Sequence, residues 1–345
     1  LPSRGVQFRH RVSRPEHSAD RIQAVVDPAM FGRAYDADFA GSAIRTRFGV
    51  RADRLRVEGG RVTGVSAHRR DGGAALEVHA ARAVVIATGG FQAGHRLRER
   101  YQSFAAAQSP YYGTADCRGD GHLMGAAVGG DLVNMAYLPP TVLAASTVVE
   151  NAIAINSAGA RFHNETGSFA ERVEALRTQD HRRAWYVLDA TAARAQAHLI
   201  DQMPQPPVRA GSVAEFPADT PFDVKEDAEA FLAGHATKMR PDQLAKVAQR
   251  LAATISGWNA FLASPAAADP QFGRSALPQG RRQLGTPLVA VPMVEGVNFS
   301  CGGFRTTTRM QIRDACGAPI PGLYAAGDTT GGLNAAAGMA GLHIS

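Results

Sequence analysis

A short apolar run near the end of the chain, closing on small residues, an acid and a glycine pair, limits the possible folds more than any other feature. It comprises Ile320-Pro321-Gly322-Leu323-Tyr324-Ala325-Ala326-Gly327-Asp328-Thr329-Thr330-Gly331-Gly332. Such a run predicts a strand whose end lets a bulky polyhydroxylated ligand approach the backbone, because glycine and alanine leave room and a carboxylate accepts hydrogen bonds from hydroxyl groups. We therefore predict a cofactor segment.

A second run of this kind lies far upstream, at Ala83-Val84-Val85-Ile86-Ala87-Thr88-Gly89-Gly90-Phe91. The pair resembles the flavoprotein family that includes fumarate reductase, succinate dehydrogenase, L-aspartate oxidase, tricarballylate dehydrogenase and the 3-ketosteroid dehydrogenases. Three further segments resemble the family's Gly-Asp-Gly, its N-x-x-G-x-R-F-x-N-E signature and its T-x-G-G. They are Gly119-Asp120-Gly121, Asn156-Ser157-Ala158-Gly159-Ala160-Arg161-Phe162-His163-Asn164-Glu165 and Ser300-Cys301-Gly302-Gly303.

The resemblance implies an α/β fold, in which a Rossmann-like FAD-binding domain, incomplete in this chain, carries an inserted α+β capping domain. We expect the FAD-binding domain over residues 1–110 and 286–345, and the capping domain over residues 111–285. Arg161 and Glu165 are expected to form a structural pair within the capping domain. The implied cofactor is FAD, and the residues that the resemblance assigns to it are Thr88, Gly89, Gly90, Asp120, Gly302, Gly303, Gly327 and Asp328.

Two parts of the family pattern are absent from these residues. The family opens with a strand, a G-x-G-x-x-G turn and a helix, which together hold the FAD pyrophosphate, and the sequence contains no such turn. It also stops at His343-Ile344-Ser345, where family members begin a helix that faces the flavin ring. We expect both ends to be missing from this sequence; a native chain this short is expected to bind FAD weakly or not at all.

Composition indicates an ordinary globular protein. The 345 residues suffice for two domains with cores, and 45% apolar with 20% charged residues is typical usage. No run approaches the roughly 18 apolar residues of a membrane span, and the first residues do not resemble a signal peptide. Three scattered cysteines, Cys117, Cys301 and Cys316, do not form a disulfide framework. We expect a soluble cytoplasmic protein.

The net charge of +6 raises the question of nucleic-acid binding. Because the basic residues are spread along the chain without interleaved aromatic residues, we expect no nucleic-acid partner. The histidines His122, His163 and His343 lack ligand spacing, so no metal site is expected.

The local patterns also predict individual elements. Two strands are expected around the turn Asp71-Gly72-Gly73, at residues 51–65 and 75–87. Helices are expected at residues 34–48, 121–128, 190–200, 225–233 and 241–262. In the last of these, apolar residues recur with a period near 3.6, which predicts a core-facing helix.

The positions that hold substrate carboxylates in the fumarate reductase branch are occupied here by other residues. The matching positions are Pro139, Gly167-Ser168-Phe169, Phe299 and Gly338, in place of two histidines and two arginines. Without a bidentate arginine, nothing offsets the desolvation of a dicarboxylate. Pro139, Phe169, Phe299 and Met339 instead suggest an apolar pocket, as in the 3-ketosteroid dehydrogenase branch. The catalytic tyrosines of that branch are not found at their positions, so these residues do not assign the branch.

The chemistry common to the family passes a hydride between flavin N5 and one carbon of a C–C bond, while a protein group handles the proton on the neighbouring carbon. The candidates for that proton are Tyr111, Tyr112, Tyr137 and Arg305. For each tyrosine, a half-buried structural role is the more frequent alternative.

We therefore expect an FAD-dependent oxidoreductase acting on CH–CH groups of an apolar, ketosteroid-like or enone substrate. One alternative is a carboxylate-specific reductase whose anion clamp has moved to residues such as Arg305 or Arg309. The other is an FAD-free binding or scaffold protein. The electron donor or acceptor is unknown at this stage, as is the direction of the reaction.

Overall fold

The computed structural model describes residues 2–12, 22–138, 141–144, 146–201, 207–216, 241–275, 277, 280–297 and 300–331. The chain divides into two compact units. The first unit comprises Leu1–Gln102, Thr114–Tyr137 and Phe299–Ser345, and the second comprises Ser103–Gly113 and Leu138–Asn298.

These units differ in three segments from the domains that the sequence predicts, which change at residues 110/111 and 285/286. Residues 103–110, predicted in the FAD-binding domain, lie in the second unit, where the Val297 N–H donates to the Pro110 carbonyl at 2.9 Å. Residues 114–137 lie in the first unit because helix α4 (Asp120–Ala127) packs beside strand β3 (Val50–Glu58), and β7 (Leu132–Val133) pairs with β14 (Gly303–Phe304). Residues 286–298 lie in the second unit because β12 (Leu288–Pro292) pairs with β10 (Ala184–Asp189). Contacts between segments far apart in the sequence therefore decide these differences.

The first unit contains two three-stranded sheets. In one, β3 pairs with β4 (Arg61–Arg69), which pairs with β5 (Ala75–His79), all antiparallel. In the other, β16 (Pro319–Ala325) lies between β15 (Gln311–Arg313) and the parallel strand β6 (Val84–Ile86). The remaining elements are η1 (Pro2–Arg4), the pair β1 (Phe8–Val12) and β2 (Ile22–Val25), α1 (Ala29–Ala40), α2 (His95–Tyr101) and η4 (Gly327–Thr329).

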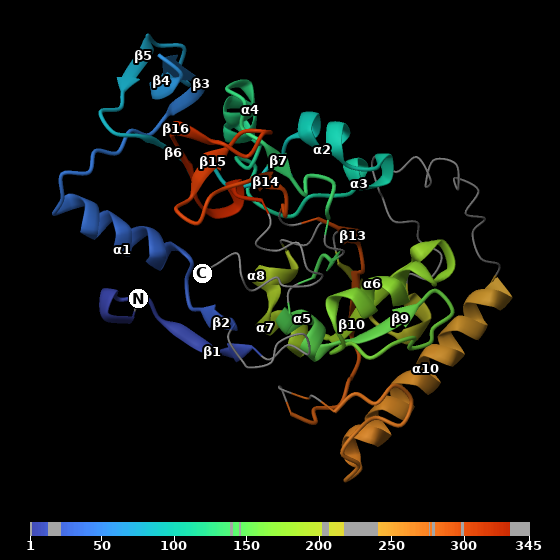
Figure 1. Cartoon of the computed structure of the whole chain (residues 1–345). Coiled ribbons are helices and arrows are strands. Elements are labelled where there is room, and N and C mark those ends of the chain that lie inside the picture. Colours follow the sequence, from blue (N-terminus) through green and yellow to red (C-terminus); the bar gives the residue numbers. More distant parts are fainter. Residues whose placement is uncertain are drawn as a thin grey trace. The chain divides into compact units, whose positions relative to one another are not determined.

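One apolar core joins these sheets to α4. Leu55 and Val62 from the first sheet, Ile86 and Leu323 from the second, and Met124 from α4 are all buried in it. In Figure 1, β16 and β6 lie between the antiparallel sheet and the strands β7 and β14. This arrangement leaves the carboxyl ends of β6 and β16 together at one edge.

Some predicted elements of the first unit have other bounds in the structure. The expected strand 51–65 is two strands, because Gly59 and Gly60, with φ of +55° and +74°, turn the chain between β3 and β4. The expected strand 75–87 is likewise divided into β5 and β6. The helix expected at 34–48 is α1, which ends before Gly41, and the helix expected at 121–128 is confirmed as α4.

The second unit is built on an antiparallel sheet of order β11-β12-β10-β9, with β11 at Val208–Ala210 and β9 at Ile153–Asn156. Strand β10 is wholly buried, and its alternate residues pack into two different cores. Tyr186 and Leu188 belong to the first core, and Trp185 and Val187 belong to the second. The first core takes side chains from α5 (Ser146–Asn151), α6 (Phe169–Arg177), α7 (Ala190–Ala195) and α8 (Ala197–Ile200). The second takes them from α10 (Pro241–Ala263), which Figure 1 shows as one long orange helix.

The smaller elements of this unit are α3 (Phe104–Gln108), β8 (Thr141–Val142), η2 (Asp180–Arg182), η3 (Val213–Glu215) and β13 (Glu295–Gly296). The helix expected at 190–200 is broken into α7 and α8 at Gln196. The helix expected at 241–262 is confirmed as α10, and its predicted apolar face is buried at Val247, Leu251 and Trp258. The helix expected at 225–233 lies outside the described residues.

A buried ion cluster fixes the predicted signature segment of the second unit. The guanidinium of Arg161 donates to both carboxylate oxygens of Glu165 at 2.8 and 2.9 Å, and to Asp269 at 2.9 Å. Arg274 reaches Glu165 at 3.2 Å and the carbonyl of Ala152 at 2.6 Å. All four charged side chains are buried. The pair expected between Arg161 and Glu165 is thus present, as part of a larger cluster.

Candidate FAD site

The two predicted cofactor segments lie side by side in the first unit. Strands β6 and β16 are parallel, with Leu323 opposite Val84 and Ala325 opposite Ile86, and the Ala326 N–H donates to the Ile86 carbonyl at 3.0 Å. Because parallel strands end at the same edge, the loop Thr88-Gly89-Gly90 and the turn at Gly327 and Asp328 meet there. Ligands of open α/β sheets bind outside such carboxyl ends.

The predicted glycines fall into two groups. Gly89 and Gly327 have φ of +72° and +71°, and no heavy atom lies within 4 Å of the position that a Cβ of Gly327 would take. At Gly90, Gly302 and Gly303, by contrast, a Cβ would lie 2.6 Å from Ser300 Oγ, 2.4 Å from Met135 Cα and 2.3 Å from the Thr329 carbonyl oxygen. The protein itself fills the space beside these three, whereas Gly327 leaves space open for a ligand.

A cavity of about 340 Å³ adjoins this edge, and two predicted residues, Thr88 and Asp120, line it. Its charged lining comprises Arg51, Arg70, Arg118, Asp116 and Asp120. The Asp120 carboxylate is paired with Arg51 at 2.8 Å, and Asp116 lies 3.6 Å from Arg70. Three guanidinium groups against two carboxylates leave a cationic excess, which suits an anionic ligand. No motif identified the arginines in the sequence, because they come from three separate segments.

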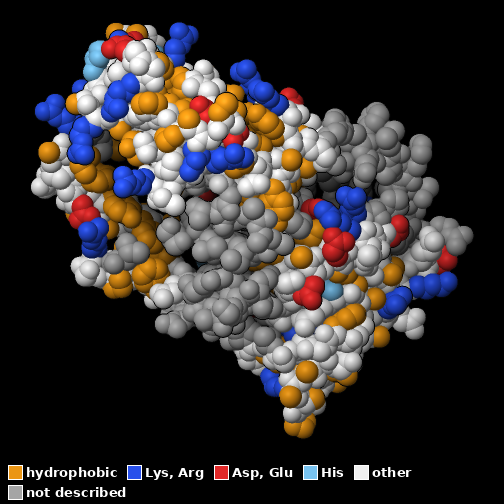
Figure 2. Space-filling model, viewed as in Figure 1, with side chains coloured by type: hydrophobic (Ala, Val, Ile, Leu, Met, Phe, Trp, Pro, Cys, Tyr) orange, Lys and Arg blue, Asp and Glu red, His pale blue; other side chains and the backbone are white. Residues whose placement is uncertain are grey.

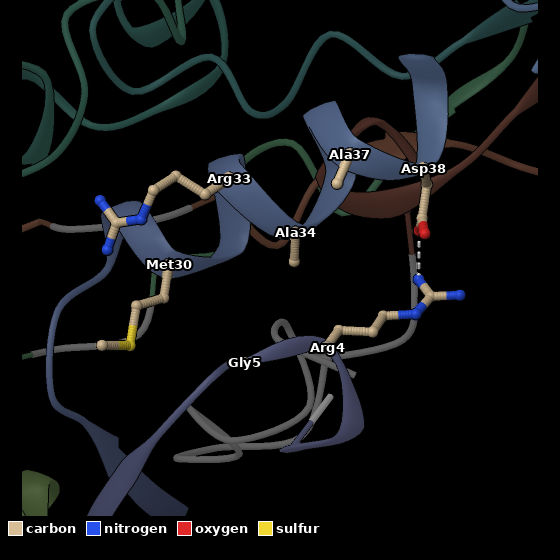
Figure 3. A pocket seen from close by; sticks show the side chains of 7 residues that line it. All are labelled: Arg4, Gly5, Met30, Arg33, Ala34, Ala37 and Asp38. Carbon is tan, nitrogen blue, oxygen red and sulfur yellow. Dashed lines mark hydrogen bonds and ion pairs between the residues drawn. The ribbon is translucent and has the colours of Figure 1, made fainter. Parts of the chain in front are cut away.

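A second cavity, of about 420 Å³, lies between η1 and α1 (Figure 3). Met30, Ala34 and Ala37 form its apolar part, and the ion pair between Arg4 and Asp38, at 2.5 Å, closes one side. It contains none of the predicted site residues. The sheet edge and its 340 Å³ cavity therefore define the candidate site.

His122 is a buried polar side chain in the same unit. Its ring lies between Phe91, at 5.4 Å, and Phe304, at 5.8 Å between ring centroids. Neither ring nitrogen has a hydrogen-bond partner among the described residues. Burial lowers the pKa of His122 to about 4, although the nearby Gly302 backbone and the charge of Asp328 act in the opposite direction. The imidazole is therefore neutral at pH 7.

Asp328 also influences the residues of the T-x-G-G segment. Burial, together with the Asp328 carboxylate, raises the pKa of Cys301 to about 12. Burial and, to a smaller extent, Cys301 raise the pKa of Tyr137. His122, Asp328, Cys301 and Tyr137 thus form one electrostatic neighbourhood in the first unit.

The four predicted catalytic residues are divided between the units. Tyr111 and Tyr112 belong to the second unit, where the Tyr112 N–H donates to the Val297 carbonyl at 2.8 Å and burial raises the pKa of Tyr112. Tyr137 and Arg305 belong to the first unit. Arg305 lies 3.2 Å from Asp131 with half of its side chain exposed. Tyr137 is linked to Asp328 through Cys301, which contributes with burial to the raised pKa of Tyr137 and whose own pKa burial and Asp328 raise.

Of the residues at the predicted substrate positions, Pro139, Phe299, Gly338 and Met339 lie outside the described residues. Phe169 is the first residue of α6, which Ser168 and Glu171 cap reciprocally. The buried Arg172, one turn further along the helix, stacks its guanidinium 4.8 Å from the centre of the Phe169 ring. No sequence pattern identifies this cation, because it does not occupy the family's arginine position.

Among the described residues, no group of histidine, cysteine, aspartate and glutamate side chains could hold a metal ion, and no helix is long and apolar enough to cross a membrane. On the face that Figure 2 shows, Lys and Arg side chains are scattered among apolar and uncharged ones.

The open turn at Gly327, the Asp328 carboxylate and the cationic cavity fit a ligand with both hydroxyl and phosphate groups. This fold and site define an α/β protein that binds a nucleotide cofactor. A family model described as "FAD binding domain" matches residues 4–344, and the chain belongs to this family. Its cofactor is FAD.

The chain is 29% identical over 298 residues to NADH:acrylate oxidoreductase of Vibrio harveyi. The matched region covers 83% of this chain and 27% of that relative. It is 29% identical over 312 residues to 3-oxosteroid 1-dehydrogenase of Mycobacterium tuberculosis, covering 80% of this chain and 53% of the relative. The open conformation of a flavocytochrome c3 fumarate reductase shares the fold, with a TM-score of 0.67 at 21% identity, over 97% of this chain and 56% of that one. The chain thus spans between about a quarter and about half of these proteins.

Proposed function

We propose that the protein is a flavin-dependent oxidoreductase acting on a C–C bond next to an activating group. The meeting of the two cofactor segments at the ends of β6 and β16 carries this proposal. The relatives support it, because they are named as an acrylate oxidoreductase, a probable fumarate reductase and a 3-oxosteroid dehydrogenase. When bound, FAD takes up or releases the hydride at N5 of its ring.

We assign the nucleotide half of FAD to the 340 Å³ cavity. Arg51, Arg70 and Arg118 supply the positive charge that a diphosphate requires, and the partly exposed Gly89 allows close approach of the backbone. Asp328 is assigned to the ribityl chain, where its carboxylate accepts hydrogen bonds from hydroxyl groups.

Tyr137 is the proposed proton donor in the reductive direction. A tyrosine hydroxyl is protonated at neutral pH because its ordinary pKa is about 10, and burial raises the pKa of Tyr137 further. The residue lies near Cys301 and in the unit that contains Asp328. Tyr111 and Tyr112 remain the alternatives from the second unit. Arg305 is the weakest of the four candidates because its guanidinium is paired with Asp131.

The substrate is proposed to be apolar, ketosteroid-like or an enone, because the segment Gly167-Ser168-Phe169 stands where the fumarate reductase branch has its arginine. The alternative is a small unsaturated carboxylate. Arg172 favours this alternative, because its guanidinium lies over the Phe169 ring, 4.8 Å from the ring centre, while its Nε donates to the Gly167 carbonyl at 3.0 Å. A carboxylate clamp could then use Arg172 rather than Arg305 or Arg309.

The first test is the visible absorption spectrum of the protein purified from its full reading frame. Bands at about 370 and 450 nm would establish bound flavin, and a colourless folded protein would support the FAD-free scaffold alternative. The reduced protein is then mixed separately with 3-oxosteroids, cyclohexenones, acrylate and fumarate while flavin reoxidation is followed. Reoxidation by ketones, unchanged in Arg172→Met, supports the apolar substrate. A rate of reoxidation by acrylate or fumarate that falls at least about tenfold in Arg172→Met supports a carboxylate substrate.

A further inference from the structure

Two hydroxyl groups from distant parts of the chain hold the loop that follows β6. Ser300 Oγ accepts a hydrogen bond from the Phe91 N–H at 2.8 Å, across 209 residues of sequence. Thr329 Oγ1 donates to the Gly89 carbonyl at 3.2 Å, across 240 residues. Ser300 is 2% exposed and Thr329 is fully buried, so neither hydroxyl is in contact with bulk water.

These two bonds fix the two peptide groups that flank Gly90. Because a peptide group is planar and trans, the bond to the Gly89 carbonyl also sets the direction of the Gly90 N–H, and the bond from the Phe91 N–H sets that of the Gly90 carbonyl. Gly90 has no side chain that could interfere, and a Cβ there would lie 2.6 Å from Ser300 Oγ. Gly90 therefore makes room for the serine hydroxyl.

The loop is therefore held on its buried side, whereas its other side is accessible. Gly90 and Phe91 are buried behind the two hydroxyls, whereas Thr88 is exposed, Gly89 is partly exposed, and Thr88 lines the 340 Å³ cavity. Gly89, with a φ of +72°, joins the exposed Thr88 to the buried Gly90. A rotation of either fixed peptide group would move the backbone of Thr88 and Gly89 in the cavity wall.

We propose that Ser300 and Thr329 are positioning residues for FAD, which hold the Thr88–Gly89 backbone in the conformation that binds the cofactor. This inference rests on the proposed FAD site at the sheet edge. Neither residue needs to touch FAD, because each acts through the loop.

The test uses Ser300→Ala and Thr329→Val, each of which removes one hydroxyl, and Thr329→Ser, which keeps it. Thr254→Val is the matched control, because Thr254 Oγ1 also donates to a glycine carbonyl, that of Gly159 at 2.9 Å, but in the second unit. The Kd for FAD is measured by flavin fluorescence, the spectrum of the bound flavin is recorded, and exchange of the Phe91 amide is followed without FAD.

We expect Ser300→Ala and Thr329→Val each to raise the Kd by about tenfold, the change that corresponds to one hydrogen bond of ordinary strength. Both should shift the flavin spectrum, and Ser300→Ala should speed exchange at Phe91. Thr329→Ser and Thr254→Val should bind FAD within about twofold of wild type. A wild-type Kd and spectrum in both Ser300→Ala and Thr329→Val would overturn the inference alone. Failure of the wild-type protein to bind FAD would instead overturn the proposed site.

Discussion

At the scale of single residues, Glu165 and His122 are buried titratable side chains with opposite surroundings. Glu165 in the second unit has four donors, from Arg161 twice, Arg274 and the Ala154 N–H, which hold its pKa at about 2 despite complete burial. His122 in the first unit has no partner for either nitrogen among the described residues. The first arrangement stabilises a charge, whereas the second keeps an imidazole neutral.

Glu165→Gln is expected to destabilise the second unit by about 3–5 kcal/mol, because it leaves Arg161 and Arg274 buried without their shared counter-ion. Both tryptophans, Trp185 and Trp258, lie in the second unit, so urea unfolding followed by their fluorescence reports on it. Glu171→Gln, on the exposed side of α6, is the control and should cost about 1 kcal/mol. Equal losses in the two variants would contradict a special role for the cluster.

The stability of the first unit should depend on pH through His122. Its folded pKa, about 4, is below the ordinary 6.5, so the unfolded chain binds the proton more readily. Stability is then lost as pH falls from 6.5 towards 4, by about 2 kcal/mol between pH 7 and pH 5. The free energy of unfolding of the wild type and of His122→Leu is measured by denaturant titration at pH 7 and at pH 5. The fall in this free energy between the two pH values should be smaller in His122→Leu by about 2 kcal/mol. An equal fall in the free energy of unfolding in the wild type and in His122→Leu would argue against a buried neutral imidazole.

At the scale of elements, the approach of α4 to the end of β6 decides the shape of the cavity wall. A Cβ at Gly121 would lie 2.2 Å from Thr88 Oγ1 and 2.4 Å from Ile86 Cγ2. The helix therefore needs a glycine at this place for its contact with the strand. Gly257 in α10 has no such neighbour, since nothing lies within 4 Å of its Cβ position outside the helix backbone.

Gly121→Ala and Gly257→Ala are expected to have opposite effects. The first should destabilise the protein by about 1–3 kcal/mol through overpacking, and weaken FAD binding by displacing Thr88. The second should stabilise α10 by up to about 1 kcal/mol, because alanine is the better helix former. Thermal unfolding and FAD titration of both variants provide the check. Normal FAD affinity in Gly121→Ala would show that Thr88 does not form part of the cofactor site.

At the scale of the whole molecule, each unit has its own buried core, and FAD is assigned to the first unit alone. A ligand stabilises the part of a protein that binds it. Free FAD at 100 times its Kd should therefore slow amide exchange of β6, α4 and β16 by an amount that corresponds to about 2.7 kcal/mol. The tryptophan-detected unfolding of the second unit should stay unchanged. A shift of equal size in that transition would show that the two units unfold as one.

Features that depend on neighbouring residues could be predicted from the amino-acid sequence: the family, the two strand ends with their glycines and acid, α4, and α10 with its buried face. Each follows from a local pattern, because side-chain periodicity and backbone freedom act within a few residues. The same local view missed the turn at Gly59 and Gly60, which divides one predicted strand into two.

Which remote residues meet depends on the folding of the whole chain. The parallel pairing of β6 with β16, the three arginines around the cavity, and the hydroxyls of Ser300 and Thr329 on the loop at Gly89 come from segments far apart in the chain. Nothing in the sequence near Gly90 indicates whether its missing side chain leaves room for a ligand or for Ser300. Packing between remote segments settles that question, because it alone determines which atoms occupy the space beside a glycine.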